Sequence, residues 1–129
     1  MDGGLAILPA MDRFFSLDEA RDVLADARDM RAVILAVRAD LAELEADIRT
    51  GEVSPLGGRP ELKGLHARLH SAIEWFGSNG VHVRGWAPLL LDFPGELDGT
   101  AVHWCWLEGE RELAWYHRRD CGFAGRRPV

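Results

Sequence analysis

Apolar residues recur at helical spacing along the first part of the chain, and this pattern predicts one long helix. Ten apolar positions follow one another at intervals of three or four residues: Leu17, Ala20, Leu24, Ala27, Met30, Ile34, Val37, Leu41, Leu44 and Ile48. Their mean spacing is about 3.5 residues, the period of a coiled-coil seam. Ser16 and Glu19 form a capping-box pattern at the start of the helix, and Gly51 is the expected stop.

The length of this predicted helix has a consequence for assembly. At 1.5 Å per residue it is about 50 Å long, whereas a compact chain of this size has a radius of gyration of about 14 Å. The helix must therefore bend, break or project from the rest of the protein. A projecting apolar seam needs a partner, so we predict a homodimer held by the helix Leu17–Ile48.

A second apolar stripe predicts a shorter helix after a loop. The loop is Thr50–Arg59, which is rich in Gly and Pro, and Pro60 suits the first turn of a helix that runs to about Gly77. One face of this helix carries Leu62, Leu65, Leu69, Ile73 and Phe76. We expect the two helices to form an antiparallel hairpin that covers about half of the longer helix.

From Val81 onward the apolar period changes to two, which is typical of β-strands. Four runs predict strands: Val81–Trp86, Leu89–Phe93, Thr100–Leu107 and Arg111–His117. A short hairpin turn is expected at residues 108–110, and residues 118–129 form a tail without clear periodicity. The predicted fold class is α+β, with a long N-terminal helix and a second helix paired as an antiparallel hairpin and packed on a small antiparallel β-sheet.

The length of 129 residues fits a single domain, 1–129. Within it we expect a leader at residues 1–12, a helical hairpin at 13–79 and a β-rich cassette with its tail at 80–129. The cassette concentrates the unusual residues, since it holds four of the five tryptophans, the only tyrosine and both cysteines. The alternation places Trp104 and Trp106 on one face of their strand and His103 and Cys105 on the other.

The charge distribution excludes some classes of partner. The formal net charge is −6, and residues 1–50 hold eleven acidic and six basic side chains. This acidic first half argues against a protein that wraps nucleic acid, because phosphate binding needs a stripe of basic side chains. The sequence has neither a signal peptide nor an apolar run long enough for a membrane span. With only two cysteines, we expect a cytoplasmic protein with free thiols.

Several segments resemble one family in their order and spacing. They are Arg13–Ala20 (RFFSLDEA), Leu90–Pro94 (LLDFP), Cys105-Trp106, Gly109-Glu110, His117 and Gly122–Arg126 (GFAGR). The family is a bacterial group that is catalogued only as a domain of unknown function, number 2203. The resemblance implies no activity, substrate or cofactor. It marks Asp92, Glu110, His117, Gly122 and Arg126 as signature positions, and it leaves both Met1 and Met11 open as the start.

Three of these positions carry side chains that suit a polar site. Asp92, Glu110 and His117 offer two carboxylates and an imidazole, which can bind a divalent metal or transfer protons. In the structural alternative, Asp92 caps a turn, Glu110 lies at a hairpin tip and His117 hydrogen-bonds across the sheet. If 111–117 is one strand, Glu110 lies about 20 Å from His117. A site of Asp92 with His117 therefore stays open.

Other histidines and the cysteines offer weaker metal sites. His66 and His70 lie one helical turn apart, which can hold zinc only if further ligands arrive. The simpler interpretation is that His66 is a histidine at the boundary of the apolar face. Cys121 with His117 makes two ligands and not a closed zinc site. We expect Cys105 and Cys121 not to be bonded to each other.

The tail contains two glycines around an aromatic residue, followed by arginine. Gly122 and Gly125 permit sharp turns on either side of Phe123, and Arg126 offers a fork for a carboxylate or phosphate. One interpretation is a site for a small anionic ligand. The other, which we favour, is that Phe123 is buried and Arg126 is anchored bidentately to a carboxylate, which fixes the tail to the body.

The sequence favours a small non-catalytic binding or interaction module that self-associates through its helices. The alternative is a small metal-binding protein or an enzyme with a site around Asp92 and His117. The candidate ligand-binding residues are Asp92, Glu110, His117, Gly122, Phe123 and Arg126. No cofactor is expected, whether the protein is an enzyme stays open, and a small anion or another protein is a possible partner. RNA binding through the tail arginines is the weakest hypothesis, because the rest of the chain is acidic.

Overall fold

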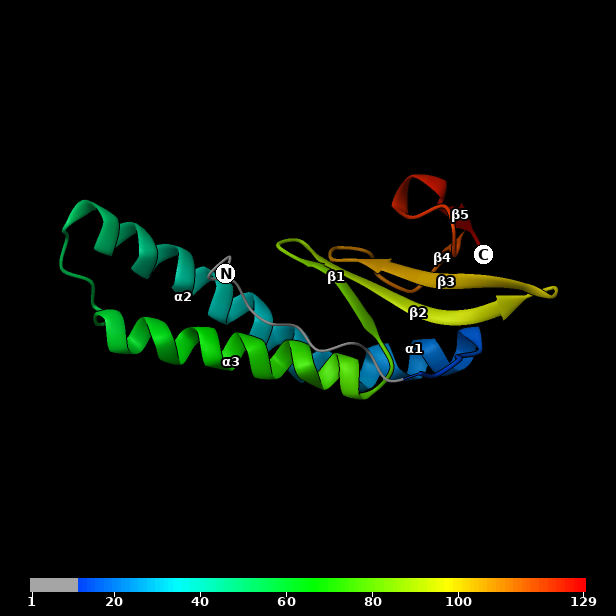
Figure 1. Cartoon of the computed structure of the whole chain (residues 1–129), viewed down its shortest axis with the longest axis horizontal. Helices are drawn as coiled ribbons and strands as arrows, with labels where there is room; N and C mark the ends of the chain where they lie inside the picture. Colours follow the sequence, from blue (N-terminus) through cyan, green and yellow to red (C-terminus); the bar gives the residue numbers. More distant parts are fainter. Residues whose placement is uncertain (1–11) are drawn as a thin grey trace. The chain divides into compact units, whose positions relative to one another are not determined.

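The structure is a computed structural model of the chain, and it describes residues 12–129. Two compact units are distinguished within it. One holds Asp29–Trp75 and is helical, and the other holds residues 12–28 with Phe76–Val129 and contains the sheet (Figure 1). Apart from Asp12, the predicted leader at 1–12 lies outside the described residues. The single domain stays a prediction.

The N-terminal helix begins as predicted but is interrupted. α1 spans Leu17–Asp26 and α2 spans Arg28–Thr50. The predicted capping box is present, with the Glu19 N–H donating to Ser16 Oγ at 3.0 Å. At Ala27 ψ is 6°, which lies outside the helical range. The predicted helix is therefore broken, which is one of the three outcomes that its length allowed. The break falls at a residue with high helix propensity, so the sequence did not indicate its position.

In the helical unit, α2 and α3 (Arg59–Ser78) run antiparallel, which confirms the predicted hairpin (Figure 1). Gly51 ends α2 with φ at +79°, a conformation that favours glycine. The central seam positions are buried within the chain itself; they are Ile34, Val37, Leu41 and Leu44. Because the break shortens the first helix, α2 and α3 have similar lengths, 23 and 20 residues.

The other unit contains a five-stranded antiparallel sheet in the order β1-β2-β3-β4-β5. The strands are β1 His82–Trp86, β2 Leu89–Leu97, β3 Thr100–Leu107, β4 Trp115–Arg118 and β5 Arg127–Pro128. Asp98 and Gly99 join β2 to β3, with φ at +51° and +81°. Positive φ at both positions matches the two-residue hairpin turns whose twist suits antiparallel strands.

Two strands of the cassette have other bounds than the sequence predicts. β2 continues to Leu97, four residues beyond the predicted end at Phe93. The fourth strand begins at Trp115 and not at Arg111. Leu113 is fully buried, and its carbonyl accepts a hydrogen bond from Arg21 Nε at 3.1 Å. Residues 108–114 belong to no strand, so the predicted tight hairpin at 108–110 is a longer connection.

One face of the sheet packs against α1 and the segment that precedes it (Figure 1). The Phe15 ring meets the Phe93 ring edge-on at 5.5 Å, and the Trp104 indole donates to the Phe15 carbonyl at 2.8 Å. Phe15 also forms a parallel bridge with Gly95. A Cβ on Gly95 would lie 2.6 Å from the Phe15 carbonyl and would also collide with the Trp104 indole. This close approach requires glycine.

The C-terminal segment lies on the opposite face of the sheet from α1 (Figure 1). It contains η1, the short 3-10 helix Phe123–Gly125, followed by β5, which pairs with β4. The Val129 N–H donates to the Ala114 carbonyl at 3.0 Å. The tail that the sequence left without a structure is therefore bound to the edge of the sheet, and it borders the polar face described next.

Candidate functional site

Strand register gathers polar residues on the face of the sheet opposite α1. Asp92 of β2 pairs with Cys105 of β3, and His103 of β3 pairs with His117 of β4. Paired residues on neighbouring strands point to the same face, and residues two apart along a strand do so as well. The three strands therefore present Asp92, His103, Cys105 and His117 together.

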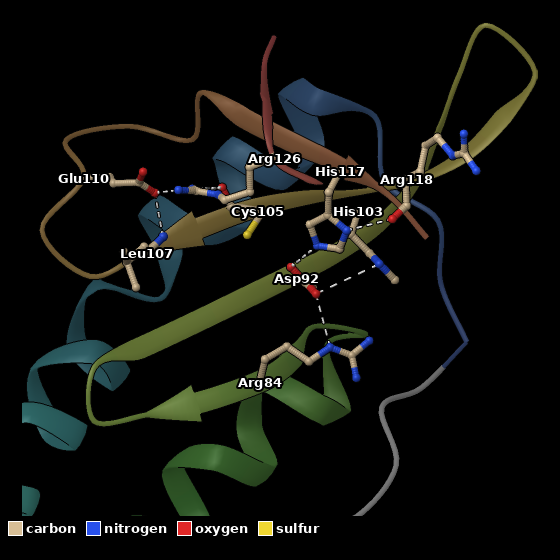
Figure 2. Close-up of polar contacts among 9 residues, drawn as sticks. All are labelled: Arg84, Asp92, His103, Cys105, Leu107, Glu110, His117, Arg118 and Arg126. Atoms are coloured by element: carbon tan, nitrogen blue, oxygen red, sulfur yellow. Dashed lines mark hydrogen bonds and ion pairs between the residues drawn. The ribbon is translucent and has the colours of Figure 1, made fainter. Parts of the chain in front are cut away.

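Asp92 is the centre of this cluster (Figure 2). Its Oδ1 lies 3.1 Å from His117 Nε2, and its Oδ2 accepts from Arg84 Nε at 3.1 Å. His103 Nδ1 lies 4.0 Å from the same Oδ2. Asp92 and both histidines are buried, whereas the Arg84 side chain is 46% exposed. A buried carboxylate of this kind needs charged or polar partners, because burial disfavours its ionised form.

The tautomer of His117 follows from its second ring contact. His117 Nδ1 lies 2.8 Å from the Arg118 carbonyl oxygen, and a carbonyl oxygen can only accept. Nδ1 therefore carries a proton. In the neutral ring the other nitrogen, Nε2, then presents its lone pair to the Asp92 carboxylate, which also presents a lone pair.

His103 is buried without a hydrogen-bond partner at Nδ1 among the described residues. Its ring centroid lies 5.3 Å from that of His117 and 5.7 Å from that of His82. Burial lowers the pKa of His103 to about 4, although the negative charge of Asp92 opposes this shift. Its imidazole is therefore neutral at pH 7, which leaves a ring nitrogen available as an acceptor or a ligand.

A cavity of about 290 Å³ opens above the cluster. Its lining includes the four polar residues of the cluster together with Arg84, Leu90, Arg119, Gly122 and Phe123. Arg119 follows β4 and lies two residues after His117, so it continues the same alternation. The cavity therefore has a polar floor and a wall with two cationic side chains.

The structure separates the six candidate residues of the sequence into two groups. Asp92, His117, Gly122 and Phe123 border the cavity, whereas Glu110 and Arg126 bind each other at 2.6 Å. Glu110 also accepts from the Leu107 N–H at 2.6 Å. Figure 2 shows the Glu110–Arg126 pair beside the Asp92 cluster, which Arg126 contacts through the Cys105 carbonyl.

The tail is anchored as the sequence predicts, but by a different set of contacts. Arg126 Nη2 donates both to Glu110 Oε1 and to the Cys105 carbonyl at 3.1 Å. One nitrogen makes both bonds, so the predicted bidentate fork on the carboxylate is wrong. The guanidinium lies over the rings of Trp115 and Phe123, 5.0 and 4.8 Å from their centroids. Phe123 itself is 48% exposed, so its predicted burial is also wrong.

The predicted metal ligands His70 and Cys121 are not part of the cluster. His70 pairs with Glu74 on α3 at 3.1 Å, within the helical unit. Both cysteines are free; Cys105 is buried and Cys121 is exposed. Burial, with the nearby charge of Asp92, raises the pKa of the Cys105 thiol to about 12. Cys105 is therefore a protonated wall residue of the cavity at neutral pH.

Sequence reasoning missed His103, Arg84 and Arg119 as members of the site. The alternation of Thr100–Leu107 placed His103 on the face of its strand opposite Trp104 and Trp106. It did not give the register between β3 and β4, which brings His103 beside His117. Arg84 lies at a bulge, where the pairing of β1 with β2 shifts between Val83 and Gly85, and no sequence pattern announces that shift.

Comparison with models of known families tests the resemblance that the sequence suggested. The family model described as "Uncharacterized conserved protein (DUF2203)" matches residues 13–129. The chain belongs to the DUF2203 family. Comparison with curated proteins and with solved structures finds no match. The function of this DUF2203 protein must therefore be inferred from its own site.

None of the helices within residues 12–129 is long and apolar enough to cross a membrane.

Proposed function

We propose that this DUF2203 protein binds one divalent transition-metal ion through Asp92, His103 and His117. Their ligand atoms all lie within 4.8 Å of one another, and all three residues are buried. Two imidazoles and one carboxylate form a ligand set that suits zinc and iron(II). The proposal is close to the sequence-based alternative of a metal site around Asp92 and His117, with His103 added.

The observation that carries the proposal is the pair of contacts made by His117. Its Nδ1–H donates to the Arg118 carbonyl, and its Nε2 faces Asp92 Oδ1 at 3.1 Å. Histidines that ligate metals typically donate their other ring N–H to a carbonyl or carboxylate, which fixes the tautomer. A cation between Nε2 and Oδ1 converts the opposition of two lone pairs into two coordinate bonds.

The distances are compatible with one ion. Bonds of about 2.1 Å in a tetrahedral site place neighbouring ligand atoms about 3.4 Å apart. The separation of His117 Nε2 from Asp92 Oδ1 is 3.1 Å, close to that value. His103 would need a small movement toward the ion, and its buried Nδ1 has no hydrogen bond to lose among the described residues.

Arg84 supports the same arrangement from outside the ligand set. It binds Asp92 Oδ2 at 3.1 Å, which leaves Oδ1 for the ion. Ligating carboxylates are commonly oriented by such outer contacts. Three protein ligands also leave at least one coordination position, as in catalytic zinc sites. The adjoining cavity, which the three ligand residues line, would give an exogenous molecule access to a bound ion.

A purely structural alternative competes with this proposal. If His117 is doubly protonated, it forms a buried ion pair with Asp92, and no metal is needed. Nitrogen NMR of the imidazole rings before and after addition of zinc distinguishes the two cases. If both ring nitrogens of His117 stay protonated at pH 7 with one equivalent of zinc present, the ion pair is established and the metal centre is refuted.

The direct test is titration of untagged, EDTA-treated full-length protein with zinc by calorimetry. We expect one equivalent of zinc per chain, and cobalt(II) in its place should give d–d absorption bands. His103→Ala and His117→Ala should each weaken zinc binding about a hundredfold or more, since outer partners alone contribute 10–100-fold. Asp92→Asn, which conserves side-chain volume, should weaken it too.

His66→Ala is the matched control, because His66 lies on α3 in the helical unit. It should bind zinc like the parent protein. Circular dichroism without metal must show that the ligand variants are folded. Zinc binding by the parent at less than one-tenth of an equivalent, or equal binding by folded ligand variants, would contradict the proposal.

We also propose, from the sequence, that the chain self-associates and resides in the cytoplasm. The motive for the dimer is weaker than the sequence suggested, because Ile34 and Leu41 of the seam are already buried within the chain. Light scattering at micromolar concentration should give twice the chain mass. Leu35→Asp is the variant to compare, because Leu35 is 39% exposed on α2, and a strictly monomeric parent would refute self-association.

A further inference from the structure

The cavity above the candidate metal centre has features that three metal ligands do not require. Its wall carries two arginines, a half-buried leucine and an exposed phenyl ring. We propose that the cavity binds a small organic acid, whose carboxylate pairs with Arg119 and whose apolar body lies against Leu90 and Phe123. The inference rests on the proposed function, because it names the ligand class that would reach the metal centre.

Arg119 is the cation that is free to bind such an acid. The neighbouring Arg118 is held by Asp120 through two hydrogen bonds, at 3.0 and 2.6 Å, and Arg84 is held by Asp92. The Arg119 guanidinium has no hydrogen bond or ion pair with any residue from 12 to 129, although it lines the cavity. A planar guanidinium at a cavity wall suits a carboxylate, which it can bind with two parallel hydrogen bonds.

The charge of the cavity also favours an anion. Within residues 12–129, Asp92 supplies the only carboxylate that lines the cavity, and Arg84 already binds it. A divalent ion bound to Asp92 adds two further positive charges to those of Arg84 and Arg119. A neutral or cationic ligand would leave this excess uncompensated in a partly enclosed space, where charges interact more strongly than in water.

The apolar part of the wall limits the ligand to one with a hydrophobic body. Phe123 lines the cavity with 48% of its surface exposed. Beside it, Gly122 has φ at +70°, and a Cβ at this position would meet nothing within 4 Å. The backbone turns here at a glycine that lines the cavity, and the space beside Gly122 is open. A volume of about 290 Å³ is at the lower end for ligand sites, which suits a molecule of roughly ten heavy atoms.

Benzoate is a suitable probe, because it joins a carboxylate to an apolar ring. We would titrate zinc-loaded protein with benzoate by calorimetry and expect saturable binding at one site. Arg119→Gln should weaken benzoate binding about tenfold or more, since hydrogen bonds to charged groups are the strong ones. Phe123→Ala should weaken it as well. Arg111→Gln is the matched control, since Arg111 is exposed and does not line the cavity, and it should bind like the parent.

The outcomes separate this inference from the metal proposal. Zinc binding without benzoate binding would overturn the organic acid and leave the metal centre intact. Arg119-dependent benzoate binding by protein that takes up no zinc would support the acid site and refute the metal centre. Sulfate has the charge but not the apolar body. Sulfate binding as tight as benzoate binding would overturn the choice of an organic acid in favour of a simple oxyanion.

Discussion

Arg126 donates to Glu110 across 2.6 Å and thereby ties the C-terminal segment to the connection between β3 and β4. The same Nη2 atom donates to the Cys105 carbonyl. The Arg126 side chain is 11% exposed and that of Glu110 is 22% exposed. The pair is therefore only slightly screened by solvent, unlike the exposed pair of Arg118 with Asp120 at 58% and 67%.

We expect Arg126→Ala to lower the free energy of unfolding by about 2–3 kcal/mol, because it removes a charge-assisted hydrogen bond to Glu110 and a second one to the Cys105 carbonyl. Arg126→Lys should cost about 1 kcal/mol, since an ammonium group can reach the acceptors but cannot lie flat over Trp115 and Phe123. Urea unfolding followed by circular dichroism measures both. Arg127→Ala, at an exposed position, is the control, and equal stability of all four proteins would show that the anchor contributes nothing.

The exposure of Phe123 changes the cost expected for its removal. Phe123→Ala should lower the free energy of unfolding by about 1 kcal/mol or less. The ring is 48% exposed, so its removal costs the contact with Arg126 and the burial of only part of its surface. Phe93 is fully buried, and Phe93→Ala should cost about 3–5 kcal/mol. Thermal melting of both variants compares them directly. A loss at Phe123 as large as that at Phe93 would mean that the ring is buried in solution.

Two glycine substitutions should change stability in opposite directions. Gly95→Ala forces a Cβ toward the Phe15 carbonyl and the Trp104 indole, so we expect a loss of about 1–3 kcal/mol. Gly64 lies in α3, and a Cβ there would meet nothing within 4 Å. Gly64→Ala should therefore gain up to about 1 kcal/mol from helix propensity. Denaturant midpoints give both signs, and a neutral Gly95→Ala would refute the close approach of α1's leading segment to β2.

The two cysteines should differ in reactivity. Cys105 is buried with its pKa raised to about 12, so at pH 8 it has almost no thiolate, whereas Cys121 is exposed. Brief alkylation without reductant should add one label to native protein and two to denatured protein, as measured by intact mass. Cys121→Ser should remove the native label. Absence of labelling after denaturation would instead reveal a disulfide between them.

Much of the fold was predictable from local signals. The capping box of Ser16 and Glu19, the stop at Gly51 and the change from helical to alternating periodicity near Val81 each depend on residues close in sequence. Such signals reflect backbone geometry and the burial of one face, and both can be read without knowing what lies across the interface. The antiparallel helical pair and the α+β class follow from them.

Three features of the structure did not follow from the sequence patterns. The break at Ala27 occurs in a segment with no proline or glycine, where helix propensity favours continuation. Leu113 is fully buried and bound through its carbonyl to Arg21, 92 residues earlier, which shortens the fourth strand. Phe123 is 48% exposed although the Arg126 guanidinium lies over its ring. The position of Leu113 depends on a partner that is distant in the chain, so local patterns could not supply it.

The sequence by itself determined which residues alternate on the strands and that Asp92 and His117 suit a polar site. Only the tertiary structure decided that His103 joins them, that Arg84 binds the far oxygen of Asp92, and that Glu110 pairs with Arg126 instead. The reason is register: a shift of one residue between two strands turns every side chain to the other face. The register of β2, β3 and β4 is set by the Asp98-Gly99 turn and by the connection around Leu113, and together these place three strands' polar residues on one face.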